Sequence, residues 1–430
     1  MKPERAAPHG AEGAVSPLNK GLGAGPGTMN QALERGAIRG LGWNLLREDV
    51  SLPAAVLYEA KMEHNLRWMQ RFIDAYGLKL APHGKTTMAP ALFQRQLEHG
   101  AWGITLATAQ QVHAAYAHGV RRVLMANQLV GRENRAAIAR LLRDAEFEFY
   151  CLVDSPENVE QLGQHFSPLG LRLNVLIELG VEGGRSGVRD EAQLAAVLDA
   201  LVPWKGTLAL CGVELYEGVL KEEDEIRAFL RRGAEVTRRL LGAQRFERTP
   251  ALLSGAGSAW YDVVAEEFAA ADLGDAVDVV LRPGCYLTHD VGAYREAQTR
   301  ILAQNPIARE MHAGLEPALQ VWAYVQSMPE AGKAIIAMGK RDAAFDSGLP
   351  VPALHYRPGD AAPRATPGHW SVTKMMDQHA FLAMHDEDDV HVGDMIGFDI
   401  AHPCLTFDKW RVLLVVDEKF DVVDAVQTYF

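Results

Sequence analysis

Short apolar runs alternate with segments of helical spacing from about Pro53 to Asp290. The runs are rich in valine, leucine and isoleucine, and helical patterns such as Asp190–Leu201 and Lys221–Leu241 separate most of them. Repeated strand–helix units with apolar strands favour a parallel sheet that is covered by helices. The predicted strands are AAVLYE, LKLAPH, WGITLAT, RRVLMANQ, FEFYCLVDS, LRLNVLIELG, LALCGVELYEG, ALLSGAG and VDVVLRPGCYL.

The number of these units decides between two architectures. About eight strand–helix units in roughly 250 residues fit a closed (β/α)8 barrel better than an open sheet. The chain carries no dinucleotide-binding glycine fingerprint, which counts against a doubly wound sheet. We therefore predict an α/β protein whose (β/α)8 TIM barrel spans residues 51–306.

The pattern changes after Ile307, where strands joined by turns replace the strand–helix units. Two valine-rich runs flank Asp417-Glu418-Lys419 and predict a hairpin at the C-terminal end. Loops rich in proline and glycine are expected from Pro350 to Gly368. We predict a second, mostly antiparallel β domain over residues 307–430, to which residues 29–50 can contribute, and a flexible tail over residues 1–28.

Composition narrows the class of protein. The chain has 430 residues, 48% hydrophobic and 23% charged, which suits a globular protein with room for two domains. The net charge of −12 argues against nucleic acid or an anionic membrane as the main partner. We find no apolar run of membrane-spanning length and no signal-peptide core at the start. Four scattered cysteines do not form a disulfide framework, and we predict a cytoplasmic protein.

One lysine lies at a position where (β/α)8 barrels carry active-site residues. In the stretch APHGKTTMAP, Lys85 follows an apolar strand and precedes a helical segment that starts at Pro90. Sites on (β/α)8 barrels gather at the carboxyl ends of the strands. A lysine there is either an ordinary solvated side chain or a reactive amine, and the choice depends on the segments that follow.

Four glycine-bearing segments further along the chain each end a predicted strand. Loops of this kind present bare amides and hydroxyls that can bind phosphate. Gly257 and Gly284 are expected to allow close backbone approach and a positive φ. The candidate residues on these segments are Arg185 and Gly187; Tyr216; Ser254, Gly255, Gly257 and Ser258; and Arg282, Gly284, Cys285 and Tyr286.

Taken in order with Lys85, these segments resemble the fold-type III pyridoxal-phosphate enzymes, specifically the D-threonine aldolase and D-serine dehydratase family. The resemblance runs from about Pro53 to the C-terminus and implies a barrel of the alanine racemase N-terminal type. It makes Lys85, in HGKT, the Schiff-base lysine and Arg185, in EGGRSGV, the contact to the phenolic oxygen of the cofactor. SGAGSAWYD and RPGCY then look like the phosphate cradle, in which the binding residues are Ser254, Gly255, Gly257, Ser258, Gly284, Cys285 and Tyr286.

Arg282 departs from the pattern of the aldolases, which tend to have an uncharged residue at that place. Alanine racemases share the barrel and carry an arginine there against the ring nitrogen, and Tyr216 would lie beside it. A cation at that nitrogen disfavours a protonated pyridinium. The alternative is a salt bridge at the strand end. The chain shows no match to the tyrosine segment that racemases supply from their second domain.

A histidine and a cysteine near the C-terminus raise the question of a metal. His402 and Cys404 are two residues apart, in a strand or turn, and in an extended chain their side chains point to the same face. Zinc favours nitrogen and sulfur ligands. Such a pair is more often packing or surface, but the resemblance implies a divalent metal beside the cofactor. Cys404 in place of an aspartate is the dehydratase-like form and suits zinc. His379 and His83 have no assigned role.

The resemblance implies β-elimination from a D-3-hydroxy amino acid such as D-serine, which gives a keto acid and ammonia. Lys85 is then the expected base for the α-proton, and the metal activates the β-hydroxyl. The alternative is an aldolase that cleaves the Cα–Cβ bond of the same class of substrate. A non-catalytic binder of pyridoxal phosphate fits less well, because such proteins lack a second domain, and we find no ligand clusters for a cofactor-free metal hydrolase. The family also implies a homodimer.

Overall fold

The structure is a computed structural model that describes residues 14–15, 33–34 and 38–430. The chain divides into two compact units. The barrel unit comprises residues 64–289, 293–316 and 429–430, and the sheet unit comprises residues 290–292, 317–428 and the described residues up to Glu63. Most of the predicted tail, residues 1–28, lies outside the described residues. The part of it that is described is β1 (Ala14–Val15), which pairs with β2 (Leu33–Glu34). No helix of the described residues has the length and apolar character to cross a membrane.

The barrel unit is built on eight parallel strands. Seven pairings join them in the order β4-β11-β10-β9-β8-β7-β6-β5, and a parallel bridge between His83 and Thr105 joins the two ends of this row. The sheet is therefore closed, as the sequence predicts. The strands are β4 (Lys79–Leu80), β5 (Ile104–Leu106), β6 (Arg122–Gln128), β7 (Glu148–Val153), β8 (Leu173–Leu179), β9 (Leu208–Leu215), β10 (Ala251–Gly255) and β11 (Val277–Leu281).

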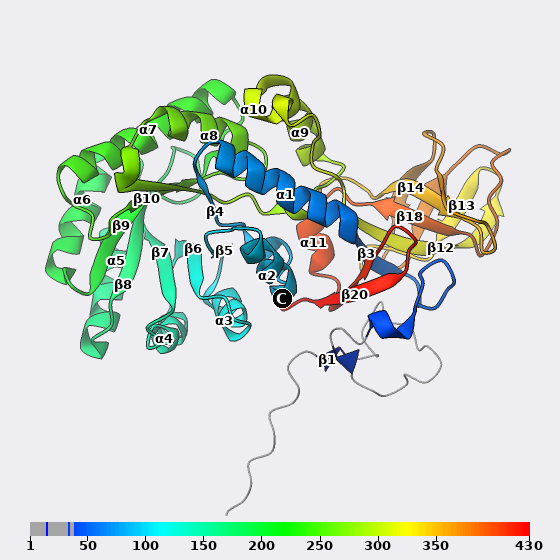
Figure 1. Ribbon diagram of the computed structural model, residues 1–430, viewed down its shortest axis with the longest axis horizontal. Coiled ribbons are helices and arrows are strands. Elements are labelled where there is room, and N and C mark those ends of the chain that lie inside the picture. The colour runs from blue at the N-terminus through cyan, green and yellow to red at the C-terminus, as the bar shows by residue number, and fades with distance from the viewer. Residues whose placement is uncertain (1–13, 16–32, 35–37) are drawn as a thin grey trace, which may run out of the picture. The chain divides into compact units, whose positions relative to one another are not determined.

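Helices follow the strands in turn and lie outside them (Figure 1). Local signals start several of them. The side chains of Thr108, Ser155 and Asp190 each accept a hydrogen bond from the amide three residues on, which satisfies a free N–H of the first turn. The helices are α1 (Glu59–Ala75), α2 (Pro90–Glu98), α3 (Ala109–Ala117), α4 (Arg132–Leu141), α5 (Pro156–Phe166), α6 (Glu191–Leu201), α7 (Glu223–Gly242), α8 (Tyr261–Ala270), α9 (Ala293–Gln304) and α10 (Pro306–Glu310).

Side chains fill the inside of the barrel. Alternate residues of one strand, such as Tyr150 and Leu152 of β7, join a buried cluster to which most of the other strands contribute. The interior is thus a packed core, which leaves the loops at the strand ends as the place for a site. The members of the cluster are Ala81, Leu124, Tyr150, Leu152, Leu176, Ala209, Cys211, Leu252 and Val280.

The sheet unit is a ten-stranded, mostly antiparallel sheet, as predicted. Its main row runs β15-β14-β18-β12-β13-β17-β16, while β3 pairs with β12 and β19, and β19 pairs with β20. The predicted C-terminal hairpin is confirmed as β19 (Val412–Val416) and β20 (Val422–Gln427). The other strands are β3 (Ala54–Tyr58), β12 (Leu319–Glu330), β13 (Lys333–Ile336), β14 (Val351–Tyr356), β15 (Arg364–Ala365), β16 (Ser371–Met375), β17 (Ala380–Ala383) and β18 (Met395–Asp399).

Three strands differ from the sequence-based expectation: β3, and β14 with the two-residue β15, which both lie between Pro350 and Gly368. The first predicted barrel strand, AAVLYE, is β3, and it pairs with β12 and β19 of the sheet unit instead. A strand that is apolar on both faces fits either sheet, so its pattern does not reveal its partners. β14 lies where loops were expected. Pro352 obscures its alternation, and a register shift between Pro352 and Leu354 accommodates the residue without an amide hydrogen.

The segment before β3 packs into the core of the sheet unit. Ile38, Leu45 and Val50 are buried together with Trp322 of β12 and Leu414 of β19. The segment from residue 38 to β3 therefore packs with the C-terminal strands, although it precedes the barrel in the sequence.

Candidate active site

Lys85 lies at the carboxyl end of β4, in a 3-10 turn formed by Gly84–Thr86. His83, two residues before Lys85, forms the bridge to Thr105 that closes the barrel. Gly84 is required at the start of this turn, because a Cβ atom there would come within 2.8 Å of the Phe93 ring and 2.9 Å of Ile104. The turn therefore places the Lys85 amine, which is exposed, at the end of the barrel where active sites gather.

The pKa of His83 is lowered by burial and by positive charge around this turn. Burial, together with the charges of Lys85, Arg282 and Arg185, lowers the pKa of His83 well below its usual value. Its Nδ1 atom is buried and has no hydrogen-bond partner among the described residues. Lys85, Arg282 and Arg185 therefore all place positive charge near this turn.

The loop after β11 touches the lysine turn. A Cβ atom on Gly284 would come within 2.6 Å of the Thr86 hydroxyl oxygen and 2.7 Å of the His83 carbonyl oxygen. The backbone amides of Gly284 and Cys285 both donate to the Ser258 hydroxyl, each at 3.1 Å. Two amides, a hydroxyl and the lysine turn thus converge at this end of the barrel. Gly284 does not have the expected positive φ; it is needed for close approach.

The loop after β10 is braced by a carboxylate that sequence analysis did not single out. Glu217 is fully buried and accepts hydrogen bonds from the amides of Gly257 at 2.6 Å and Ala256 at 3.1 Å. Burial raises the pKa of Glu217, and these hydrogen bonds oppose the rise. The strained residue of the loop is Ala256, with φ of 77°, whereas Gly257 has no positive φ. The Gly257 amide, expected to face phosphate, is therefore bound by Glu217.

Arg282 ends β11 and forms a buried network. Its Nη2 group is ion-paired with Glu214 of β9, and its Nε group donates to the Ser254 hydroxyl at 3.0 Å. Burial raises the pKa of Glu214 to about 7, while the charge of Arg282 opposes the rise. Arg282 is thus the salt-bridge partner that sequence analysis gave as one alternative, and Ser254 orients the guanidinium. One oxygen of Glu214, Oε2, has no partner among the described residues.

Arg185 and Tyr216 lie side by side at the ends of β8 and β9. The Arg185 guanidinium carbon is 5.2 Å from the centre of the Tyr216 ring, a cation–π contact. Both residues line a small hollow of about 10 Å³ together with Glu178 and Ser186. The Ser186 hydroxyl donates to Glu178 at 2.7 Å, which ties the loop of Arg185 to the end of its own strand.

Tyr286 points away from this group. Its hydroxyl accepts a hydrogen bond from Gln96 of α2 at 3.2 Å, and its side chain is buried. Cys285 is also buried, with its sulfur 4.0 Å from the Thr86 hydroxyl. Of the RPGCY segment, the structure therefore brings the two backbone amides to the Ser258 hydroxyl, while the Tyr286 side chain braces α2.

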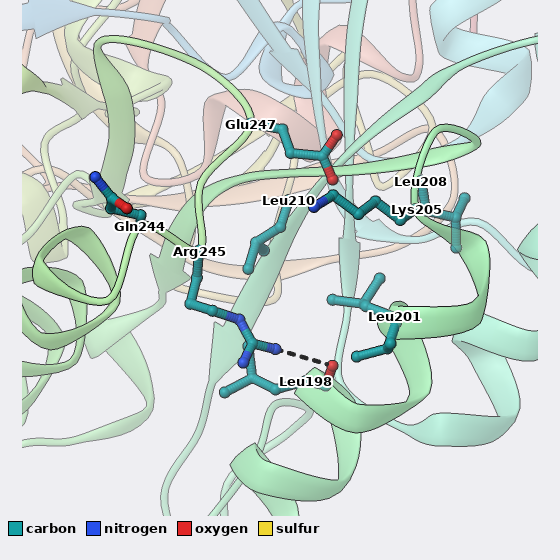
Figure 2. A pocket seen from close by; sticks show the side chains of 9 residues that line it. Leu198, Leu201, Lys205, Leu208, Leu210, Gln244, Arg245 and Glu247 are labelled. Atoms are coloured by element: carbon teal, nitrogen blue, oxygen red, sulfur yellow. Dashed lines mark hydrogen bonds between the residues drawn. The ribbon is translucent and has the colours of Figure 1, made fainter.

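A separate cavity of about 220 Å³ contains none of the predicted residues (Figure 2). Leu208 and Leu210, at the start of β9, form part of its apolar lining, and Arg245 on its rim donates to the Leu198 carbonyl at 3.2 Å. Tyr216 follows the other end of the same strand, roughly 20 Å away at the usual rise of a strand. The cavity is thus at the amino end of the barrel, away from the lysine turn.

In the sheet unit, His402 and Cys404 lie at the start of a helix. His402 directly precedes α11 (Pro403–Phe407), and Pro403 occupies the first helical position, which proline favours. The expected strand or turn is therefore corrected to a helix start. The two side chains still meet: a hydrogen bond with Cys404 raises the pKa of His402 to about 9, with burial opposing and Asp346 adding to the rise.

Asp346 completes this cluster and was not found from the sequence. Its Oδ2 atom lies 2.7 Å from Nδ1 of His402. Asp346 thus engages Nδ1, while the Cys404 sulfur contacts the same imidazole, so that the histidine and the cysteine could share one ion. The described residues hold no group of three or more His, Cys, Asp and Glu side chains arranged to bind a metal. An ion here would rely on two protein ligands and keep open positions.

His379 is exposed in the turn between β16 and β17, where its carbonyl accepts a hydrogen bond from the Met376 amide. The carboxylates Glu214, Glu217 and Asp346 are the residues that sequence analysis missed. A signal existed for the first two, because VELYEG places two acids at the end of an apolar strand, where an unpaired charge is costly. Asp346 stands in a loop and carries no such signal.

Two family models match the chain. The alanine racemase N-terminal domain matches residues 58–291, more than half of the chain, and the putative serine dehydratase domain matches residues 318–416. Together they cover both units.

Two known enzymes are similar in sequence. A D-threonine aldolase from Arthrobacter sp. is 28% identical over 316 residues, which make up 72% of this chain and 76% of that enzyme. A D-threo-3-hydroxyaspartate dehydratase from Delftia sp. (strain HT23) is 30% identical over 173 residues, which make up 40% of this chain and 45% of that enzyme.

Solved structures of both kinds of enzyme share the fold. D-threonine aldolase from Filomicrobium marinum superposes with a TM-score of 0.73 at 24% identity, over 90% of this chain and 96% of that chain. A D-threo-3-hydroxyaspartate dehydratase variant in a metal-free form superposes with a TM-score of 0.69 at 23% identity, over 89% and 98%. The chain belongs to the fold-type III pyridoxal-phosphate enzymes, in the family that joins an alanine racemase N-terminal domain to a putative serine dehydratase domain.

Proposed function

We propose that the protein is a pyridoxal-phosphate-dependent lyase of 3-hydroxy-D-amino acids, and that it eliminates water from a substrate such as D-serine to give an aminoacrylate, which water then hydrolyses to a keto acid and ammonia. Both relatives act on this substrate class by their names, one as an aldolase and one as a dehydratase. The observation that carries the choice of elimination is the sulfur of Cys404 beside His402.

The barrel unit fits the cofactor on its own features. Gly284 lets its loop approach the lysine turn more closely than a Cβ atom would allow, and the Ser258 hydroxyl, which accepts from the amides of Gly284 and Cys285, keeps its own hydrogen as a donor to a phosphate. The buried Nδ1 atom of His83 lacks a partner, and three cations surround that imidazole. An aldehyde-bearing anion therefore suits this end of the barrel.

The roles of the residues follow from that fit. Pyridoxal phosphate supplies an aldehyde for the amino group of the substrate and a ring that accepts electron density from its α-carbon. Lys85 is the amine proposed to hold the aldehyde carbon and, once released, to accept the α-proton. Arg185 is proposed for the phenolic oxygen, and Ser258, Gly284 and Cys285 for the phosphate.

Arg282 is proposed to face the ring nitrogen. Its guanidinium stays protonated and can only donate, so it would keep that nitrogen unprotonated. Glu214 and Ser254 fix its direction. Tyr216, which directly follows β9, packs against Arg185 and is proposed to line the cofactor site there.

His402 and Cys404 are the proposed metal ligands. Imidazole and thiolate favour zinc over magnesium or manganese. A divalent ion there would supply Lewis-acid activation of a hydroxyl, which is a poor leaving group without it. We also propose a cytoplasmic homodimer. None of the four cysteines, all of which lie in the described part of the chain, forms a disulfide, which suits a reducing compartment.

A second candidate is a 3-hydroxy-D-amino acid aldolase. It is favoured by the D-threonine aldolase relative, which aligns with more of this chain than the dehydratase does. Incubation with D-serine and D-threonine separates the two: elimination releases ammonia and a keto acid, whereas aldol cleavage of D-threonine releases glycine and an aldehyde. If neither D-serine nor D-threonine releases ammonia, the dehydratase assignment is wrong.

A further inference from the structure

A contact between two partly exposed side chains of the sheet unit links Asp346 with His402. The Asp346 Oδ2 atom is 2.7 Å from Nδ1 of the imidazole, and the Ser347 hydroxyl donates to the same oxygen at 3.1 Å. An ionised carboxylate accepts hydrogen bonds and donates none, so Nδ1 must carry the hydrogen. In the neutral ring, which is the form that binds a metal, the other nitrogen, Nε2, is then the one that offers a lone pair.

The backbone brings Asp346 to this place. The Thr406 hydroxyl of α11 accepts a hydrogen bond from the Ala344 amide at 3.0 Å, and Trp410 donates to the Asp342 carbonyl at 2.7 Å. Two bonds thus hold the segment before Asp346 against the helix that His402 precedes. The Gly339 amide donates to the Asp342 carboxylate at 2.8 Å and shapes the same turn. The carboxylate therefore reaches His402 from a fixed loop.

We propose that Asp346 is a positioning residue that sets the orientation and tautomer of His402, so that His402 and Cys404 together bind a divalent ion. A metal-binding histidine usually donates its second N–H to a carboxylate or carbonyl, and loss of that partner lowers metal affinity. This inference rests on the proposed metal pair. It adds a residue that does not touch the ion.

The competing explanation is an ordinary surface ion pair. The side chains of Asp346 and His402 are 38% and 28% exposed, and an exposed pair contributes little to stability. Under that explanation, removing the carboxylate changes neither the fold nor the affinity for metal. The two explanations therefore differ in zinc affinity.

The test measures Zn²⁺ affinity of the full chain by competition with a chromophoric chelator. Asp346→Ala should weaken zinc binding about 10- to 100-fold. Asp346→Asn keeps an acceptor for Nδ1–H and should lie between Asp346→Ala and the wild type. The matched control is Asp388→Asn, because Asp388 pairs with His369 at 2.7 Å in the same unit. That variant should bind zinc as the wild type does.

The variants also separate this inference from the proposed metal site. If His402→Ala and Cys404→Ala leave zinc affinity unchanged, the proposed ligand pair is wrong and Asp346 has no role. If those variants lose zinc but Asp346→Ala keeps wild-type affinity, the ligand pair stands and the positioning role is wrong. The absorption of the Co²⁺-substituted protein gives an independent readout, since a changed ligand geometry alters the cobalt–thiolate band. Circular dichroism checks that each variant is folded.

Discussion

Gly284 and Thr86 lie so close that a Cβ atom at position 284 would come within 2.6 Å of the Thr86 hydroxyl oxygen. Thr86 belongs to the turn after the first barrel strand and Gly284 to the loop after the last one. These strands are neighbours in the closed barrel, since β4 pairs with β11. The proposed Schiff-base lysine and the proposed phosphate loop therefore form one surface.

Gly284→Ala should lower the affinity for pyridoxal phosphate at least about tenfold, because the added methyl group separates the two loops, and it should cost about 1–3 kcal/mol of stability as overpacking does. Fluorescence titration of the folded variant with the cofactor measures the effect. Gly242→Ala is the control, since a Cβ atom there meets nothing within 4 Å. Wild-type cofactor affinity in Gly284→Ala would contradict the cradle.

The sequence allowed this surface to be predicted because its parts are local. A lysine or a glycine loop that follows an apolar strand needs only the strand order to be placed, and the barrel rule supplies that order. The same reasoning missed Glu217, which binds the Gly257 amide 40 residues further along the chain. Such a pairing depends on the angle at which two loops leave neighbouring strands, and hydrophobic spacing does not encode that angle.

Two other differences have the same origin. β3 was placed in the barrel because its side chains are apolar on both faces, and only its pairing with β12 and β19 reveals the other sheet. His402 and Cys404 were expected in a strand or turn, yet Pro403 between them starts a helix. In each case the residue pattern left the conformation or the partner strand undetermined.

Lys85→Ala should remove the visible absorbance of bound pyridoxal phosphate and abolish turnover, because the amine that would hold the cofactor is lost. Absorbance spectra of the purified variant, after addition of cofactor, give the measurement. Lys79→Ala is the control. Lys79 begins β4, at the other end of the same strand, and pairs with Asp278 at 2.8 Å. A Lys85→Ala variant that stays yellow and active would refute the assignment.

Glu217→Gln should destabilise the barrel unit by about 1–2 kcal/mol, because the amide group has one acceptor where the carboxylate uses two, and a buried N–H then lacks a partner. The loop that carries Ser258 should loosen with it, so cofactor affinity should fall. Urea denaturation and cofactor titration measure the two effects. Glu222→Gln, an exposed acid before α7, should change neither. If Glu217→Gln matches wild type in both assays, Glu217 does not brace the loop.

His289 predicts a pH dependence of stability. Burial, with Arg295 adding, lowers its pKa to about 4 in the folded protein, against the ordinary 6.5. Between pH 6.5 and 4, the unfolded chain therefore binds a proton that the folded protein does not, so stability falls as the pH falls through this window. The loss amounts to about 3 kcal/mol at about 1.4 kcal/mol per unit. Above pH 6.5, the His289 imidazole is neutral in both the folded and the unfolded protein, so it adds no pH dependence to the free energy of unfolding.

The free energy of unfolding at pH 7.5, 6.5, 5.5 and 4.5 tests this, with His289→Asn as the comparison. Asparagine tolerates the positive φ of 46° at this position and does not titrate. The variant should lose less stability than wild type between pH 6.5 and 4.5. Parallel curves for the two proteins would show that His289 is not the source of the slope.

Removal of metal should separate cofactor binding from elimination. Lewis-acid coordination supplies several kcal/mol toward the departure of hydroxide, whereas the groups proposed to hold the cofactor are nitrogen and oxygen donors of the barrel unit. A chelator-treated sample should therefore stay yellow while ammonia and keto acid are no longer formed from D-serine. Zinc should restore both products. Loss of colour on chelation would show that the ion supports the cofactor instead.

Cys404→Asp tests which reaction the ligand favours. The carboxylate keeps a donor at the start of α11 but replaces soft sulfur with hard oxygen, so metal preference should move from zinc toward manganese. Hydroxide departure should weaken with the change of ion, and ammonia release from D-serine should fall, while cofactor absorbance stays at the wild-type level. Cys285→Ser is the control, because Cys285 is a buried cysteine of the barrel unit and should leave metal preference unchanged. If Cys404→Asp keeps both zinc preference and ammonia release, the sulfur does not decide the reaction, and the choice between dehydratase and aldolase then rests on the products released from D-serine and D-threonine.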